Sequence, residues 1–153
     1  MNALTVALVC FLLLYFFVHN LALRLNARSA SNELPPEFRG IYDPAEYERS
    51  QEYTRAKSRL DTASSAMNTF FLVGFILLGG FAWLETAVSA LQAPWLVQGL
   101  VFLGSFAVIF ELLNLPLELV SVFGLEERYG FNRTTAATFI LDKVKTYCLT
   151  AVI

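Results

Sequence analysis

The sequence is poor in the residues that build most catalytic and metal sites. It has one His, two Cys and only 16% charged residues among 153, whereas soluble domains have about a quarter charged residues. Cys10 and Cys148 lie far apart in apolar stretches without a CxxC pattern, which is typical of small hydrophobic side chains and not of a disulfide. His19 alone cannot form a metal site. The sequence also lacks a His-Glu-x-x-His motif, a nucleophile elbow and a phosphate loop, so it contains no recognisable catalytic constellation.

Basic residues are missing from the middle of the chain. All 11 Lys and Arg fall in the two regions 24–59 and 128–145. Acidic residues alternate with them there, so no nucleic-acid-binding surface is indicated. Two apolar spans separate the two regions, which therefore lie on the same side of a membrane, and the positive-inside rule makes that side cytoplasmic. We expect the N-terminus to face outward, in a membrane of the bacterial inner-membrane or endoplasmic-reticulum type.

Long apolar runs are abundant. The chain is 56% hydrophobic with a mean hydropathy of +0.55, and about 20 apolar residues suffice to cross a bilayer as a helix. We expect spans at 3–23, 66–84 and 95–119, and hence an all-α, polytopic membrane protein. A cleaved signal peptide is the alternative for the first span. Its basic residues follow the apolar run instead of preceding it, which favours a retained anchor with its N-terminus outside.

The segment 24–65 contains a strong helix start. Asp43 is a capping residue, Pro44 suits the first helical position, and Glu46 stands where a capping box places its carboxylate. No helix breaker follows before the second span, so we expect one long helix with a cytoplasmic extension. Its narrow face of small residues predicts packing on a partner helix; a solvated helix is the alternative.

The remaining segments are shorter. We expect an outer loop at 85–94, a cytoplasmic loop at 120–132, and the start of a further helix at 133–153, for which Asn132 is a plausible cap. The apolar part of this last helix is too short to cross a bilayer. The sequence therefore predicts three transmembrane helices and a truncated fourth.

Polar residues interrupt the third span. Glu111, Asn114 and Glu118 are spaced by three and four residues and so lie on one face of a helix. An acidic residue at hydrocarbon depth costs up to about 3 kcal/mol, so Glu111 should face protein or water. We therefore consider Glu111 and Asn114 as candidates for lining an aqueous cavity, with Glu118 near the interface. A Glu111 side chain that snorkels to the interface is the alternative.

One stretch, GLEERYGFNRTTAATFILDKVK, resembles the N-terminal membrane region of the type I CAAX prenyl proteases. The resemblance is carried by Leu115 and Pro116 at the end of a span, and then by Glu126, Glu127, Gly130, Phe131, Asn132, Thr135, Phe139, Asp142 and Lys145. The earlier helix is similar to the same family at Ser50, Tyr53 and Lys57.

The resemblance implies part of a polytopic zinc metalloendopeptidase whose membrane helices wall a water-filled chamber. In that family a downstream His-Glu-x-x-His motif and a distant Glu bind zinc, and here they would lie beyond Ile153. We therefore assign no catalytic or zinc-binding residue, expect no cofactor in this chain, and expect it to be inactive alone. The expected partners are the lipid bilayer, the C-terminal zinc-binding part of the parent protein and a membrane or prenylated protein substrate. The alternative is a small non-catalytic membrane protein that assembles with a partner subunit through the Glu111 and Asn114 face.

Overall fold

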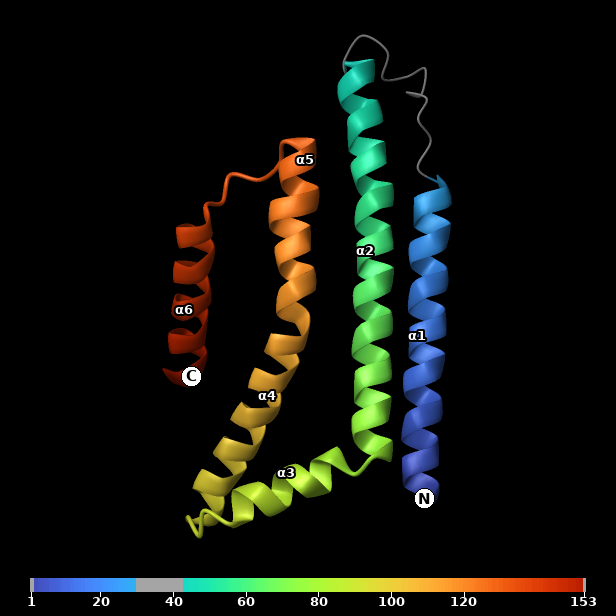
Figure 1. Ribbon diagram of the computed structural model, residues 1–153. Coiled ribbons are helices and arrows are strands. Elements are labelled where there is room, and N and C mark those ends of the chain that lie inside the picture. Colours follow the sequence, from blue (N-terminus) through green and yellow to red (C-terminus); the bar gives the residue numbers. More distant parts are fainter. Residues whose placement is uncertain (1, 30–42, 153) are drawn as a thin grey trace.

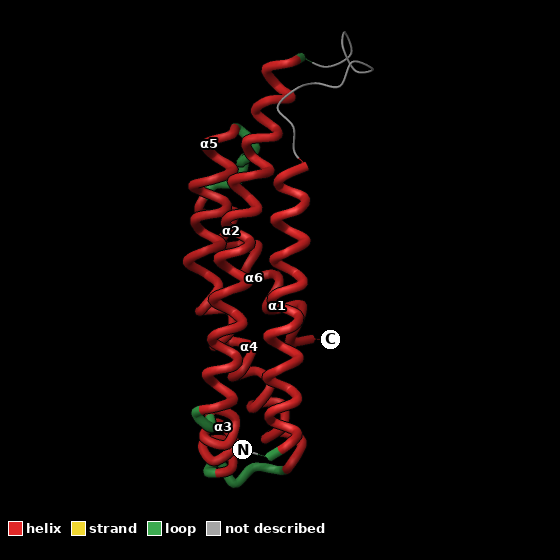
Figure 2. The backbone as a smooth tube through the Cα atoms, turned by 90° about the vertical axis from the view of Figure 1, so that its right-hand side faces the viewer, coloured by secondary structure: helices red, strands yellow, loops and turns green. Residues whose placement is uncertain are grey.

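Helices account for all the regular structure of the residues described, which are 2–29 and 43–152 of a computed structural model (Figures 1 and 2). The elements are α1 (Ala3–Ser29), α2 (Pro44–Leu77), α3 (Gly80–Ser89), α4 (Trp95–Leu119), the π-helical segment η2 (Val120–Glu126), α5 (Glu127–Tyr129) and α6 (Ala136–Val152). The predicted all-α class is confirmed.

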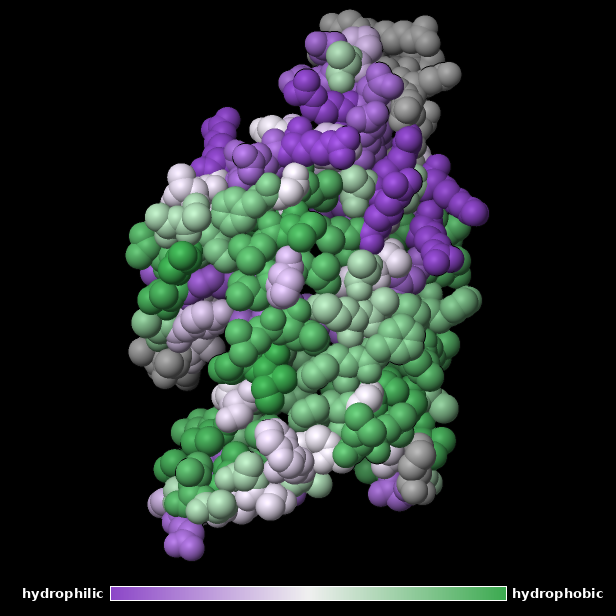
Figure 3. Space-filling model, in the orientation of Figure 1, coloured by the Kyte–Doolittle hydropathy of each residue, from purple (hydrophilic) through white to green (hydrophobic). Residues whose placement is uncertain are grey.

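The long helices stand side by side and alternate in direction (Figure 1). The end of α1, the start of α2, α5 and the start of α6 lie toward one end of the molecule, while the N-terminus, α3 and the start of α4 lie toward the other. Hydrophilic side chains gather at the first end, above a broad hydrophobic band (Figure 3). The two basic regions of the sequence thus come to the same end of the bundle.

Three helices are long and apolar enough to cross a membrane by length and composition: Ala3–Ser29, Pro44–Leu77 and Trp95–Tyr129. Many of their large apolar side chains are exposed, among them Leu4, Phe11 and Leu100. Such a surface is costly in water and suits hydrocarbon. The protein is a multi-pass integral membrane protein, as predicted.

The start of α2 follows the sequence prediction. The carboxylate of Asp43 accepts a hydrogen bond of 2.9 Å from the Ala45 backbone N–H, and Pro44 is the first helical residue. The helix then continues without interruption to Leu77. Tyr53, in its first half, packs edge-on against the rings of Tyr129 and Phe131 at centroid distances of 5.7 and 4.8 Å. Around Tyr53, α2 is therefore a packed helix, whereas most residues from Pro44 to Ser50 are exposed, so the solvated alternative describes only its first turns.

The segment expected as one span at 66–84 is not a single helix. Helix α2 ends at Leu77, and Gly79 adopts a left-handed φ of 76°, which a residue with a Cβ rarely tolerates. The chain turns there, and α3 crosses beneath α4 (Figure 1). Two apolar side chains of α3, Leu84 and Val88, are only 5% and 6% exposed.

The expected outer loop at 85–94 is consequently wrong in its first part, because α3 continues to Ser89. The sequence is uniformly apolar across Gly79, so hydropathy alone gives no sign of the bend. The third span begins at Trp95, as predicted.

The expected loop at 120–132 is also wrong in its first part. Helical structure continues beyond Leu119 through a π-helical stretch to Tyr129. Pro116, one turn earlier, lies inside α4 and has no N–H to donate, and π-type bonding is one way in which a helix absorbs such an interruption.

The predicted cap of the last helix is wrong as well. The Thr135 hydroxyl accepts from the Thr138 N–H at 3.2 Å, and the Thr135 carbonyl accepts from Phe139 at 2.9 Å, so Thr135 caps α6. The carboxamide oxygen of Asn132 instead accepts from the Thr134 N–H at 2.6 Å, a local turn before the helix.

Phenylalanine rings fill the seam between α2, α3 and α4. Neighbouring rings lie 4.9 to 6.0 Å apart, in tilted, stacked or edge-on pairs. The rings belong to Phe71, Phe75, Phe81, Phe106 and Phe110. Aromatic pairs of this kind stabilise by about 0.5–1.5 kcal/mol each beyond their buried area. They fix the position of α4, which carries the polar residues of the candidate site.

Candidate functional site

Glu111 is the centre of a charged cluster between α4 and α6. Its carboxylate accepts hydrogen bonds from the Lys143 ammonium at 2.5 Å and from the Tyr147 hydroxyl at 2.8 Å. The same ammonium pairs with Glu118 at 2.5 Å. The side chains of Lys143, Glu111 and Glu118 are 23%, 34% and 38% exposed. Glu111 is thus paired within the chain, and the alternative of a snorkelling side chain is not needed to explain it.

Asn114 lies on the same helix but turns toward a different neighbour. Its carboxamide oxygen accepts from the Asn68 amide of α2 at 2.9 Å, and its own amide donates to the Phe110 carbonyl at 2.7 Å. Residues three positions apart on a helix differ by about 60° in direction, which lets α4 contact α6 with Glu111 and α2 with Asn114. The two candidate residues therefore serve two different helix seams.

The seam between α1 and α2 has a similar polar contact. The amide of Asn20 donates to the Ser65 hydroxyl at 3.1 Å and to the Phe16 carbonyl at 2.8 Å. The carboxamide oxygens of Asn20 and Asn68 are buried and accept no hydrogen bond from the described residues. Buried acceptors of this kind are normally satisfied by water or by another protein group.

The Gly-Phe-Asn motif forms the reversal between α5 and α6. Gly130 has a φ of 78°, which favours glycine, and its N–H donates to the Glu127 carbonyl at 3.1 Å. The carbonyl of Glu126 accepts from both Phe131 and Asn132, at 2.8 and 3.1 Å. These bonds satisfy the carbonyls at the end of the helix, as expected of a helix C-terminus.

The other motif residues have structural partners too. Phe131 packs on Tyr53, Asn132 makes the turn, and Thr135 caps α6. Asp142 and Lys145 pair with each other at 3.5 Å on α6, with 61% and 75% of their side chains exposed. The motif residues thus run from the end of α4 through η2, α5 and the turn at Gly130 into α6.

Sequence reasoning missed Lys143 and Tyr147. Neither belongs to the motif that carried the resemblance, yet both contact Glu111. A usable signal was present, because an acidic residue in a membrane helix needs a partner and Lys143 lies in the nearest basic region. The register that places it opposite Glu111 depends on the turn at Gly130, which spacing alone does not reveal.

A cavity of about 320 Å³ opens beside the charged cluster. It is lined by Glu111, Glu118, Val122, Glu126, Thr134, Phe139, Asp142, Lys143, Thr146 and Tyr147. Among residues 2–29 and 43–152, no three His, Cys, Asp or Glu side chains come together in a way that fits a metal ion. The lining of this cavity therefore does not fit zinc, and its chemistry is that of hydrogen bonding and charge pairing.

Comparison with known proteins decides the family. A family described as CAAX prenyl protease N-terminal, with five membrane helices, matches residues 24–153. The chain belongs to this family.

Individual relatives agree. The chain is 30% identical over 146 residues to CAAX prenyl protease 1 of Saccharomyces cerevisiae, covering 88% of this chain and 32% of that protein. It is 28% identical over 149 residues to the CAAX prenyl protease 1 homolog of Oryza sativa, covering 91% and 35%. The crystal structure of S. mikatae Ste24p superposes with a TM-score of 0.88 at 26% identity, covering 99% of this chain and 37% of that chain. The chain spans about a third of the length of the curated relatives that it matches.

Proposed function

We propose that this chain is the N-terminal membrane domain of a CAAX prenyl protease-like zinc metalloendopeptidase, in which its helices form one wall of a hydrated chamber. The observation that carries the proposal is the Glu111–Lys143–Glu118 cluster beside an open cavity, which involves two carboxylates of a helix that is largely apolar. Ionised groups at this depth are stable only when they are paired or hydrated. A chamber wall satisfies both needs.

Polar groups elsewhere in the bundle support a hydrated interior. A second hollow, of about 370 Å³, lies between α1 and α2 and is lined by Tyr15, His19, Leu23, Asp61, Ser64, Ser65, Asn68 and Thr69. Its lining includes Asn68, one of the two residues whose buried carboxamide oxygen is left without a donor. Water in these hollows would supply the donor.

In this proposal the chain forms part of the chamber wall and contributes no catalytic residue. Zinc would be held, and water activated on it, by residues of the remaining part of the parent protein, and no step of that chemistry is assigned to a side chain of this chain. The family-motif residues would fix the chain reversal that places α6 against α4. They are Glu126, Glu127, Gly130, Phe131, Asn132, Thr135, Asp142 and Lys145. Membrane-associated or prenylated proteins would be the substrates.

The alternative function is that of a small non-catalytic membrane protein that assembles with a partner subunit. The contacts of Glu111 and Asn114 argue against it. A subunit interface through these residues requires their polar groups to be available to a partner. Glu111 already accepts from Lys143 and Tyr147, and Asn114 from Asn68. A partner would have to displace these bonds, which we do not expect.

The test uses the protein encoded by the complete gene. We expect its reading frame to contain a His-Glu-x-x-His motif after the codon for Ile153, and the purified protein to cleave a prenylated CAAX peptide. Removing zinc with a chelator should abolish cleavage and adding zinc should restore it, while the 153-residue chain alone should show none. A reading frame without the motif, or cleavage that survives chelation, would contradict the proposal.

A further inference from the structure

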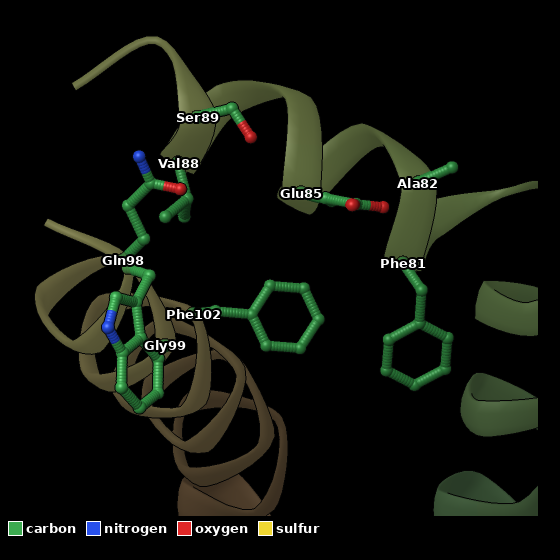
Figure 4. Close-up of a pocket in the computed structure, with 9 residues that line it drawn as sticks. Phe81, Ala82, Glu85, Val88, Ser89, Gln98, Gly99 and Phe102 are labelled. Atoms are coloured by element: carbon green, nitrogen blue, oxygen red, sulfur yellow. The ribbon is translucent and has the colours of Figure 1, made fainter. Parts of the chain in front are cut away.

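A cavity of about 440 Å³, called the α3–α4 wedge below, lies between α3 and the start of α4 (Figure 4). Figure 1 shows these elements at the opposite end of the molecule from the start of α2. It is lined by Phe81, Ala82, Glu85, Val88, Ser89, Trp95, Gln98, Gly99 and Phe102. This cavity is separate from the Glu111 cluster and has no part in the proposed chamber.

The charge in the wedge is isolated. Glu85 is the one charged residue between Asp61 and Glu111 in the sequence. Its side chain lies on the exposed surface of α3 and lines the wedge. Among the described residues, no Lys, Arg or His side chain lines the wedge beside this carboxylate, which therefore attracts a cation.

Aromatic rings form the walls. Phe81 and Phe102 lie 6.4 Å apart between centroids (Figure 4), and Trp95 is a third aromatic residue in the lining. Ring faces attract cations, by about 0.5–2 kcal/mol for an ammonium group near a ring. Carboxylate and rings therefore favour the same kind of ligand, a positively charged nitrogen.

Two further acceptors make a primary ammonium the best fit. The amide nitrogen of Gln98 donates to the Ala93 carbonyl at 2.9 Å, which leaves its carboxamide oxygen turned toward the cavity (Figure 4). The hydroxyl of Ser89 faces the same space. A primary ammonium has three N–H donors and a quaternary ammonium has none, so a cavity whose lining includes Glu85, Gln98 and Ser89 favours the primary ammonium.

The surroundings indicate that the ammonium belongs to a lipid. Trp95 lines the wedge and Trp83 lies on α3, and both are largely exposed, as in the aromatic belts of membrane interfaces. Exposed Leu96, Leu100 and Leu103 continue along α4 from the wedge toward the hydrocarbon level. They offer acyl chains an apolar surface directly below a headgroup site.

We propose that the α3–α4 wedge binds the ethanolamine headgroup of phosphatidylethanolamine, with the ammonium on Glu85 between the aromatic rings.

The test compares lipids with the same acyl chains. The chain is released from nanodiscs containing equal amounts of phosphatidylethanolamine, phosphatidylcholine and phosphatidylglycerol, and the retained lipid is counted by native mass spectrometry. We expect adducts of phosphatidylethanolamine to exceed those of phosphatidylglycerol about tenfold, with phosphatidylcholine in between. Glu85→Gln should reduce the first ratio to about one, and Gln98→Leu should remove the preference for phosphatidylethanolamine over phosphatidylcholine.

Glu127→Gln is the matched control, because it removes an exposed carboxylate at the other end of the molecule and should leave both ratios unchanged. Position is read independently in a Trp83→Phe variant, where Trp95 is the only tryptophan. Phosphatidylethanolamine brominated on its acyl chains should quench Trp95 more than brominated phosphatidylglycerol, and Glu85→Gln should equalise the two. Unchanged lipid ratios in a normally helical Glu85→Gln protein would overturn the proposal. The proposal would also be overturned if the mass spectra showed a dimer of the chain in place of lipid adducts, and if Glu85→Gln abolished that dimer. Such a result would assign the wedge to a second copy of the chain.

Discussion

Lys143 makes the most consequential side-chain contact in the structure. It contacts two carboxylates of α4 and lies over the Phe139 ring at 5.7 Å. The neighbouring basic residue Lys145 pairs only with Asp142, at 3.5 Å, with 75% of its side chain exposed. The two lysines are two positions apart on one helix, yet they face different surroundings and should differ in their energetic effect.

Lys143→Met should lower the free energy of unfolding by about 1–3 kcal/mol, because two partly buried carboxylates lose their counter-charge. Lys145→Met should change it by less than about 0.5 kcal/mol, as is usual for an exposed pair. Unfolding in mixed micelles, followed by circular dichroism as dodecyl sulfate is added, measures both. Equal destabilisation by the two substitutions would contradict this role of Lys143, and Glu111→Gln should recover part of the loss in the Lys143→Met background.

At the residue scale, the sequence predicted which side chains matter better than it predicted their partners. The acidic residue in an apolar helix identified Glu111, and the capping pattern at Asp43 identified the start of α2. The contact between Glu111 and Lys143 depends on the turn at Gly130 and on the cap at Thr135, where Asn132 was expected. Such a register is set by three-dimensional packing, and spacing in one sequence does not contain it.

At the scale of elements, α4 and α6 bound the cavity beside Glu111, called the groove below. The proposed function requires this groove to be filled with water. Thr146 lines the groove, while Cys148, two positions later on the same helix, is exposed outside it. The two positions differ by about 3 Å along the helix axis, so their depth in a bilayer is nearly the same. They form a matched pair for asking whether the groove is wet.

A thiol reacts with a maleimide as the thiolate, which requires water. Two proteins are compared, each with a single cysteine. In the first, Thr146→Cys is combined with Cys10→Ala and Cys148→Ala; in the second, Cys10→Ala leaves native Cys148. We expect the first to react with a water-soluble maleimide at least about tenfold faster than the second. The comparison is made by mass spectrometry on protein in lipid nanodiscs. Equal or slower reaction at position 146 would show that the groove is filled by lipid.

Element boundaries also show where sequence reasoning failed. The start of α4 at Trp95 agrees with the expected span at 95–119, which was placed from the long apolar run that begins there. The bend at Gly79 was missed because residues on both sides of it are equally apolar, so hydropathy predicted one continuous span. Only the left-handed backbone of Gly79, which the sequence permits but does not require, separates α2 from α3.

At the scale of the whole molecule, the positively charged side chains are concentrated at one end. The described basic residues of 24–29, 49–59 and 128–145 lie toward the end at which α2 begins, whereas the described segment from Gly80 to Pro94 at the α3 end carries Glu85 and no Lys or Arg. This arrangement supports an orientation with the basic end in the cytoplasm. The orientation itself remains a proposal that labelling can test.

We expect Ala90→Cys, at the end of α3, to be labelled by a membrane-impermeant maleimide in intact cells, with Cys10 and Cys148 replaced by Ala. Ser50→Cys, near the start of α2, should be labelled only after the membrane is permeabilised. Both positions are exposed in the structure, so a difference between them reports sidedness. The opposite pattern would place the N-terminus in the cytoplasm.

The ion pair between α4 and α6 also has a consequence for biosynthesis. Its two partners are 32 positions apart in the chain, and the acidic one is made first. At about 5–20 residues per second, translation delivers Lys143 roughly 2–6 s after Glu111. During that interval the carboxylate of Glu111 has no lysine partner in the growing chain. The hairpin formed by α4 and α6 is therefore completed late, and a nascent chain stalled before Lys143 should be recognised as unfinished by membrane quality control.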